Sequence, residues 1–188
     1  MLCARLGSLN VLEQCRSKGM WRRYLGNQPI PGADQLGRVL TRLDATAIRA
    51  QNNRTYRRLK RRKSLKPANH ENLFSVLFDG HECFASYRRC CPHCLTRTVK
   101  TKYGERVQYY HRLVMAVLVC ENFTLLLDIE MQRKGEGEVR CAERLLKRIL
   151  ADYPRAFDVV VADGLYAQGP FFKTVRRAGR HATAVLKN

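Results

Sequence analysis

Short apolar runs alternate with one stretch of helical periodicity in residues 68–188. Residues 74–78 form a short apolar run, and two longer runs, 107–120 and 123–131, are separated by a turn-like segment. Apolar runs bounded by turn residues are typical of strands. The two longer runs predict an antiparallel pair.

Helical spacing replaces this pattern in residues 136–152, where apolar side chains fall on one face and charges on the other. That apolar face consists of Val139, Ala142, Leu145, Leu146, Ile149 and Leu150. Residues 157–162 then predict a buried strand, 169–179 a short helix that opens with Pro170, and 181–187 a last strand. The predicted order is strand, long insertion, strand, strand, helix, strand, helix, strand, which is an α/β (α+β) fold with a mixed sheet.

Residues 1–67 predict a small helical region instead. Pro29 and Pro31 interrupt regular structure, Asp34 is a candidate N-cap for one helix, and residues 45–59 predict another. We therefore expect two domains: a helical region with its linker at 1–67, and the mixed-sheet domain at 68–188.

Positive charge is concentrated in the helical region. The 188 residues include 35 Lys and Arg against 16 Asp and Glu, a net charge of +19. Residues 1–67 hold 16 basic and 3 acidic residues, a net of +13, and residues 68–188 hold 19 and 13, a net of +6. This excess predicts a polyanionic partner. Nucleic acid is favoured over membrane, because no stretch approaches about 18 continuous apolar residues.

A basic run covers residues 54–66, where eight of 13 residues are Lys or Arg. It predicts contacts with the backbone of double-stranded DNA, and the alternative is a solvated helix face that continues into a linker. Arg88 and Arg89 in the insertion are further candidates, because guanidinium groups suit phosphate; plain surface charge is the alternative. The predicted contacts in the basic run are Arg54, Arg57, Arg58, Arg61, Arg62 and Lys63.

Two aspartates 84 residues apart, Asp79 and Asp163, each follow an apolar run and precede glycine. This pattern predicts a buried strand that ends in a carboxylate at the edge of a sheet. Magnesium is usually held by one or two carboxylates together with substrate phosphates. The pair therefore predicts metal-dependent phosphoryl transfer on nucleic acid. The alternative is that both residues cap helices or form turns.

The chain has 8 cysteines, for which reduced thiols are expected in a chain of this length. Cys91 and Cys94 form a Cys-x-x-Cys pair that could bind zinc with His81, His93 or His111. No second Cys-x-x-Cys pair exists, so the preferred interpretation is a basic, cysteine-rich loop that packs or contacts DNA, with Zn²⁺ as the alternative. His111 is expected on a strand, either near the metal carboxylates or hydrogen-bonded within the sheet.

The element order and several motifs resemble bacterial insertion-sequence transposases of the DDE class, which have a ribonuclease H-like catalytic domain. The resemblance covers the whole chain, weakly in the helical start and strongly from residue 78 onward. The motifs that carry it are "LFDGHE", "RRCCPHCLTRTV", "QYYHRLVMAVLV", "LLLDIE", "KGEGEVRCAERLL" and "YPRAFDVVVADGLYAQGPFF".

The resemblance implies that Asp79 and Asp163 are catalytic residues that bind Mg²⁺ or Mn²⁺. It also implies that the intact parent cuts and rejoins DNA at element ends, with element ends and target DNA as partners and a possible homo-oligomer. The family's third acidic residue, a glutamate on a downstream helix, has no match, since no glutamate follows Glu143. We therefore expect a C-terminally truncated fragment with an incomplete catalytic domain that is inactive alone.

Two other functions remain open at this point. One is a nuclease on the same fold, which would hydrolyse DNA without joining strands. The other is a non-catalytic DNA-binding or regulatory module. The N-terminus lacks the pattern of a signal peptide, so we expect a cytoplasmic protein. The resemblance implies a bacterial, nucleoid-associated protein.

Overall fold

The computed structural model describes residues 9–15, 25–69 and 71–185, and it divides the chain into two compact units, 1–48 and 49–188. The first unit contains α1 (Leu9–Gln14) and α3 (Ala33–Thr41), which contact one another. The backbone N–H of Ala33 donates to Glu13 Oε2 at 2.8 Å. Gly32 occupies the N-cap position of α3 and Asp34 lies in its first turn, so the prediction of Asp34 as the N-cap is wrong.

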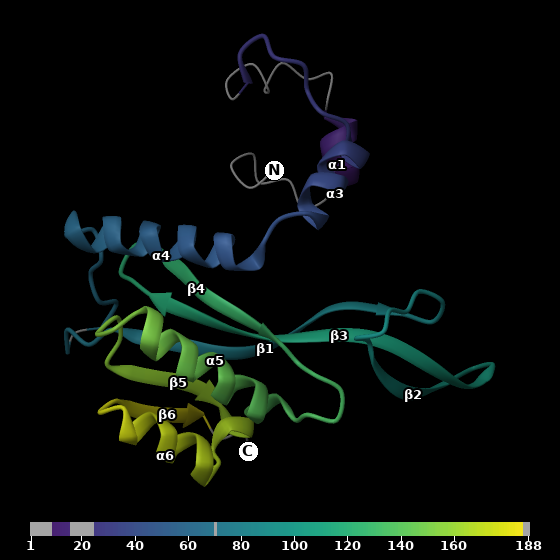
Figure 1. The fold of residues 1–188 in the computed structure, drawn as a ribbon. Coiled ribbons are helices and arrows are strands. Elements are labelled where there is room, and N and C mark those ends of the chain that lie inside the picture. The colour runs from purple at the N-terminus through teal and green to yellow at the C-terminus, as the bar shows by residue number, and fades with distance from the viewer. Residues whose placement is uncertain (1–8, 16–24, 70, 186–188) are drawn as a thin grey trace. The chain divides into compact units, whose positions relative to one another are not determined.

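The second unit is built on a six-stranded mixed sheet (Figure 1). Its strands are β1 (Ser75–Ser86), β2 (Leu95–Thr101), β3 (Gly104–Val119), β4 (Thr124–Met131), β5 (Val159–Asp163) and β6 (His181–Val185). β3 pairs antiparallel with β1 on one edge, while its other edge pairs with β2 along residues 104–110 and with β4 along residues 113–119. β1 continues the sheet into β5 and β6, to which the pairing is parallel.

The predicted order of strands and helices is confirmed, with α5 (Glu138–Asp152) and α6 (Gly169–Arg177) between the last strands. The long insertion, however, contains β2, a strand that the sequence analysis missed. β2 and the ends of β1 and β3 together form an arm that extends from the sheet (Figure 1). The β-branched residues in "LTRTVKT", Thr96, Thr98, Val99 and Thr101, are the signal that could have found β2.

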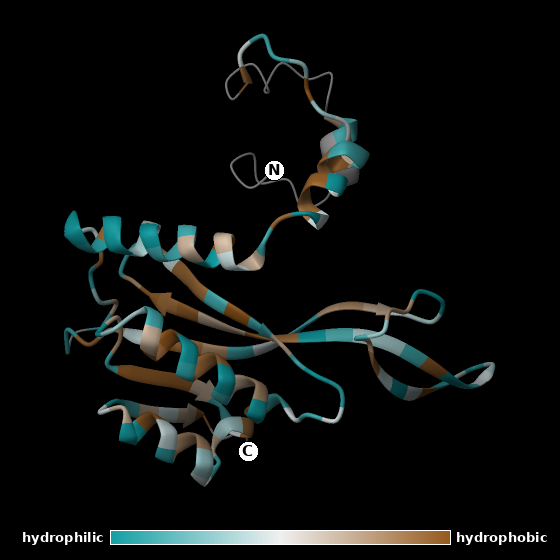
Figure 2. Cartoon of the chain, viewed as in Figure 1, coloured by the Kyte–Doolittle hydropathy of each residue, from teal (hydrophilic) through white to brown (hydrophobic). Residues whose placement is uncertain are grey.

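Two helices cover one face of the sheet. α5 contacts β3 and β4, α6 contacts β6, and the helices contact each other. The buried side chains between these helices and the sheet are almost all apolar. Figure 2 shows the strands behind α5 largely in brown, the colour of hydrophobic residues. The largest of the fully buried side chains are Tyr166, Phe157, Phe171, Leu118, Leu127, Leu145, Leu146 and Ile149. Burial of this apolar surface, at roughly 25 cal/mol per Å², is the main driving force for this unit.

Most of helix α4 (Ala45–Arg61) belongs to the second unit and packs on the same body. Tyr56 is buried and its ring meets that of Tyr153 edge-on, with centroids 5.3 Å apart. The Asn52 amide donates to the carbonyls of Leu126 and Leu127, each at 2.6 Å. The charge pattern placed a domain boundary after residue 67, whereas the compact units divide before Arg49, because α4 makes these contacts with β4 and α5.

Candidate functional site

Asp79 and Asp163 lie on neighbouring parallel strands. The register pairs Phe78 on β1 with Ala162 on β5, and each aspartate is the next residue of its strand. Phe78 and Ala162 are buried beneath the helices, and side chains alternate along a strand. The two aspartates therefore occupy adjacent positions on the face of the sheet opposite α5 and α6, where Asp79 is exposed and Asp163 is half-buried. The structure thus brings this predicted pair together.

One detail of the pair differs from the sequence-based expectation. β1 does not end at Asp79 but continues to Ser86, because its pairing with β3 extends that far. Asp163 does end β5, and its carboxylate accepts the backbone N–H of Leu165 at 3.0 Å, at the start of the short 3₁₀ helix Gly164–Tyr166. Asp163 is thus a helix cap as well as a candidate metal ligand, which combines the two alternatives that its sequence context left open.

A buried glutamate behind this pair is the residue that sequence reasoning missed. Glu138, the first residue of α5, is only 8% exposed. Its Oε1 accepts the Tyr166 hydroxyl at 2.7 Å, and its Oε2 lies 3.0 Å from Arg112 Nη2. A Cβ at Gly80 would lie 2.4 Å from the Glu138 carboxylate carbon. Glu138 therefore lies against the strand position after Asp79 and is hydrogen-bonded to the 3₁₀ helix after Asp163.

Negative charge accumulates around the Tyr166 hydroxyl. Burial raises the pKa of Tyr166 far above its usual range, the hydrogen bond and charge of Glu138 add to this, and the charges of Asp163 and Asp79 raise it further. Tyr166 therefore stays protonated and serves as a hydrogen-bond donor to Glu138. A cation beside the two aspartates would offset part of this negative potential.

The acidic residues on β4 belong to a separate ion-pair network. Asp128 accepts hydrogen bonds from Arg49 Nε at 3.0 Å and from Arg148 Nε at 2.5 Å. Glu130 pairs with Arg144 and Arg148. Burial alone would raise the pKa of Glu130, but the hydrogen bonds and charges of these arginines lower it. Arginines neutralise both carboxylates, so this network links α4, α5 and β4 and differs from an open metal site.

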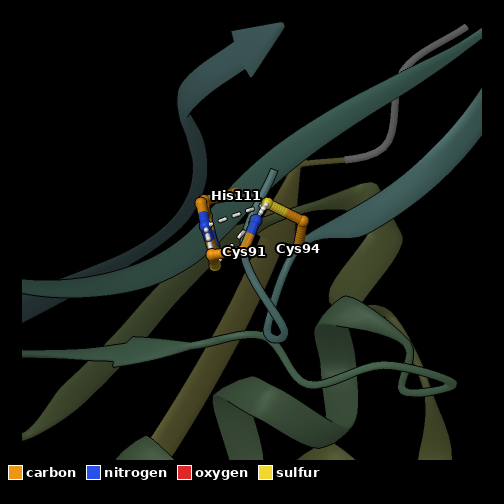
Figure 3. Close-up of side chains that lie close together, drawn as sticks. All are labelled: Cys91, Cys94 and His111. Atoms are coloured by element: carbon orange, nitrogen blue, oxygen red, sulfur yellow. Dashed lines mark hydrogen bonds between the residues drawn. The ribbon is translucent and has the colours of Figure 1, made fainter. Parts of the chain in front are cut away.

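Cys91, Cys94 and His111 lie together at the base of the arm (Figure 3). The two sulfurs are 3.7 Å apart, and His111 Nε2 is 3.3 Å from Cys91 Sγ and 3.4 Å from Cys94 Sγ. Cys94 is buried and Cys91 exposed. Among the described residues these three form the one group of at least three potential ligands, and neither His81 nor His93 belongs to it.

The predicted DNA contacts lie on two exposed segments. The side chains of Arg54, Arg57, Arg58, Arg61, Arg62 and Lys63 are exposed along the end of α4 and just after it, and Figure 2 shows this helix as mostly hydrophilic. Arg54, Arg57, Lys60 and Arg61 line a shallow hollow. Arg88 and Arg89 are exposed after β1, where their backbone N–H groups donate to Ser86 Oγ. Both segments are therefore accessible to a large anionic partner.

No protein-family model, curated protein or solved structure matches this chain. Within the described residues, none of the helices is both long and apolar enough to cross a membrane.

Proposed function

We propose that this chain is a DNA-binding protein of the DDE transposase class, in which Asp79 and Asp163 contribute to a divalent-metal site. The observation that carries the proposal is the register of β1 and β5, which puts the two carboxylates next to each other on an open face of the sheet. Mg²⁺ or Mn²⁺ held there with a DNA phosphate would activate the attacking hydroxyl or stabilise the leaving oxygen. The substrate class is double-stranded DNA at element ends and target sites.

The basic residues at the end of α4 would hold the duplex. Their side chains are solvent-exposed, while Tyr56 and Asn52 anchor the same helix to the sheet domain. An anchored cationic helix loses little conformational freedom when it binds a phosphate backbone. Contacts of this kind position a duplex without specifying its sequence, so recognition of a particular end would require further residues.

A non-catalytic DNA-binding or regulatory module is the second candidate function. It is favoured by the ligand geometry, since within the described part of the chain no third carboxylate groups with Asp79 and Asp163. The two candidates differ in one measurable property. Binding of Mg²⁺ or Mn²⁺ in the presence of duplex DNA that is lost in Asp79→Asn supports the transposase class, whereas duplex binding without such metal binding supports the module.

Replacement of Arg57, Arg58 and Arg61 by alanine tests the DNA-binding surface. We expect the affinity for a labelled duplex to fall by at least about tenfold at low salt, because each neutralised phosphate contributes through counterion release. The slope of log K against log salt should shrink by roughly 0.9 per lost contact, about 3 in all. Fluorescence anisotropy over a salt series measures both quantities.

The matched control replaces Lys173, Arg176 and Arg177, three exposed cations on α6. This variant has the same net charge as the α4 variant but keeps the proposed surface. We expect its affinity and salt slope to stay near those of the unmodified chain. Equal losses in the two variants would mean that general charge, and not this helix, governs binding.

A further inference from the structure

We propose that Cys91, Cys94 and His111 bind one Zn²⁺ ion, with a water molecule at the fourth position. Cysteine sulfur and imidazole nitrogen are the ligands zinc prefers, and a site with three protein ligands and one open position is an established zinc arrangement. The exposure of Cys91 gives solvent access to that position. This inference goes beyond the proposed DNA-binding function and does not depend on it.

The separations of the three ligand atoms match a zinc tetrahedron. With Zn–S of about 2.3 Å, Zn–N of about 2.0–2.1 Å and tetrahedral angles, two sulfurs lie about 3.8 Å apart, and a sulfur and a nitrogen about 3.6 Å. The observed separations are 3.7 Å between the sulfurs and 3.3 and 3.4 Å from the nitrogen to each sulfur. The ligand atoms therefore need to move by only a few tenths of an ångström to bind the ion.

The turn that carries the cysteines favours a thiolate at Cys91 alone: a hydrogen bond from the Cys91 backbone lowers the pKa of Cys94, but desolvation and the neighbouring Cys91 thiol raise it overall. Hydrogen bonding from the backbone of His93 is the largest cause that lowers the pKa of Cys91; desolvation opposes it, and Cys94 and the charge of Lys134 lower the pKa further. The Cys94 N–H also donates to the Cys91 carbonyl at 3.1 Å, which closes the Cys-x-x-Cys turn. Zinc binds the deprotonated thiol, so this environment supports the geometric argument.

A disulfide between Cys91 and Cys94 fits the same side chains less well. Its sulfurs would have to approach to about 2.05 Å, well inside their 3.7 Å separation. A disulfide would also leave unexplained why the His111 nitrogen lies at nearly equal distances from both sulfurs (Figure 3). A shared metal ion accounts for all three positions.

A zinc ion bound by Cys91, Cys94 and His111 would link the loop before β2 to the middle of β3. His111 lies on β3 opposite Phe84 of β1, and Leu95, directly after Cys94, pairs with Tyr110 on the other edge of β3. The ion would therefore fix the base of the arm and hold the loop that carries Arg88 and Arg89. Binding of the ion would restrict the conformations of this loop, while its fourth position stays open to water.

Metal analysis of the purified chain tests the proposal. We expect one Zn²⁺ per chain by elemental analysis, and near-complete loss of zinc in Cys91→Ser, Cys94→Ser and His111→Asn. Replacement of zinc by Co²⁺ should give the d–d bands of a tetrahedral site together with thiolate-to-cobalt charge transfer. Circular dichroism of each variant checks that it has folded.

Cys83→Ser and Cys90→Ser are the matched controls, because both cysteines are exposed neighbours outside the cluster. Both variants should keep the full zinc content. Loss of zinc in Cys90→Ser would overturn the three-ligand site. A folded unmodified chain without zinc or cobalt binding, or a Cys91–Cys94 disulfide in its mass spectrum after purification under reducing conditions, would overturn the proposal itself, even if every cluster variant fails to fold.

Discussion

Asp128→Ala is expected to lower the free energy of unfolding by about 2–4 kcal/mol, the largest loss among the single substitutions considered. The Asp128 side chain is 6% exposed and pairs with Arg49 and Arg148. Its loss leaves two partly buried guanidinium groups without their shared carboxylate. Loss of one partner of a fully buried pair costs about 3–5 kcal/mol, and the partial exposure of both arginines, 37% and 28%, places the expected value lower.

Urea unfolding followed by circular dichroism measures this loss, and hydrogen exchange locates it. Since Arg49 lies on α4, we expect the largest acceleration of amide exchange in α4 and a smaller one in α6. Asp152→Ala serves as control, because Asp152 is exposed at the end of α5, and surface changes of this kind fall within about 0.5 kcal/mol. Equal stability of the Asp128 and Asp152 variants would refute the structural importance of this network.

Gly80→Ala is expected to destabilise the sheet domain by about 1–3 kcal/mol. The added methyl group would lie 2.4 Å from the Glu138 carboxylate, which has to move. This carboxylate is the end of a flexible side chain, but it is buried and accepts the Tyr166 hydroxyl, so movement breaks that hydrogen bond. Thermal or urea unfolding of the purified variant gives the magnitude.

A double-mutant cycle with Glu138→Ala separates this clash from a general intolerance of alanine at position 80. Glu138→Ala is itself destabilising because Tyr166 and Arg112 lose their partner, but it clears the space beside Gly80. In that background we expect the cost of Gly80→Ala to fall by at least about 1 kcal/mol. Gly169→Ala, at an α6 position with open space around it, should be neutral or slightly stabilising. Strict additivity in the cycle would show that the contact with Glu138 is unimportant.

The periodicity of the sequence predicted most of the sheet domain. β4, α5, α6 and β6 lie within the segments expected for them, whereas β3 (Gly104–Val119) begins before the expected 107–120 and β5 (Val159–Asp163) extends one residue past the expected 157–162. The apolar faces or runs of these elements are the signal that located them. β2 was missed because its residues are mostly exposed, so that no apolar pattern marks it. The full length of β1 was missed for a related reason: beyond Asp79, pairing with β3 and not burial keeps the chain extended.

The neighbouring positions of Asp79 and Asp163 were expected from the sequence, although only Asp163 ends its strand. Two apolar runs, each followed by Asp-Gly, were enough to expect Asp79 and Asp163 at one edge, and the parallel pairing of β1 and β5 places them in adjacent positions. The choice of His111 over His81 and His93 depends on the register of β3 against β2, which no local pattern specifies. The contact of Glu138 with Gly80 likewise results from the packing of α5 on β1.

Manganese binding in the presence of duplex DNA tests the central claim most directly. Electron paramagnetic resonance can count bound Mn²⁺, with zinc in slight excess so that the Cys91–Cys94–His111 cluster does not compete. We expect bound Mn²⁺ that is lost in Asp79→Asn and in Asp163→Asn but retained in Glu105→Gln, an exposed carboxylate on the arm, while all four proteins bind the duplex equally. Undiminished Mn²⁺ binding in both aspartate variants would contradict the assignment of this pair as a metal site.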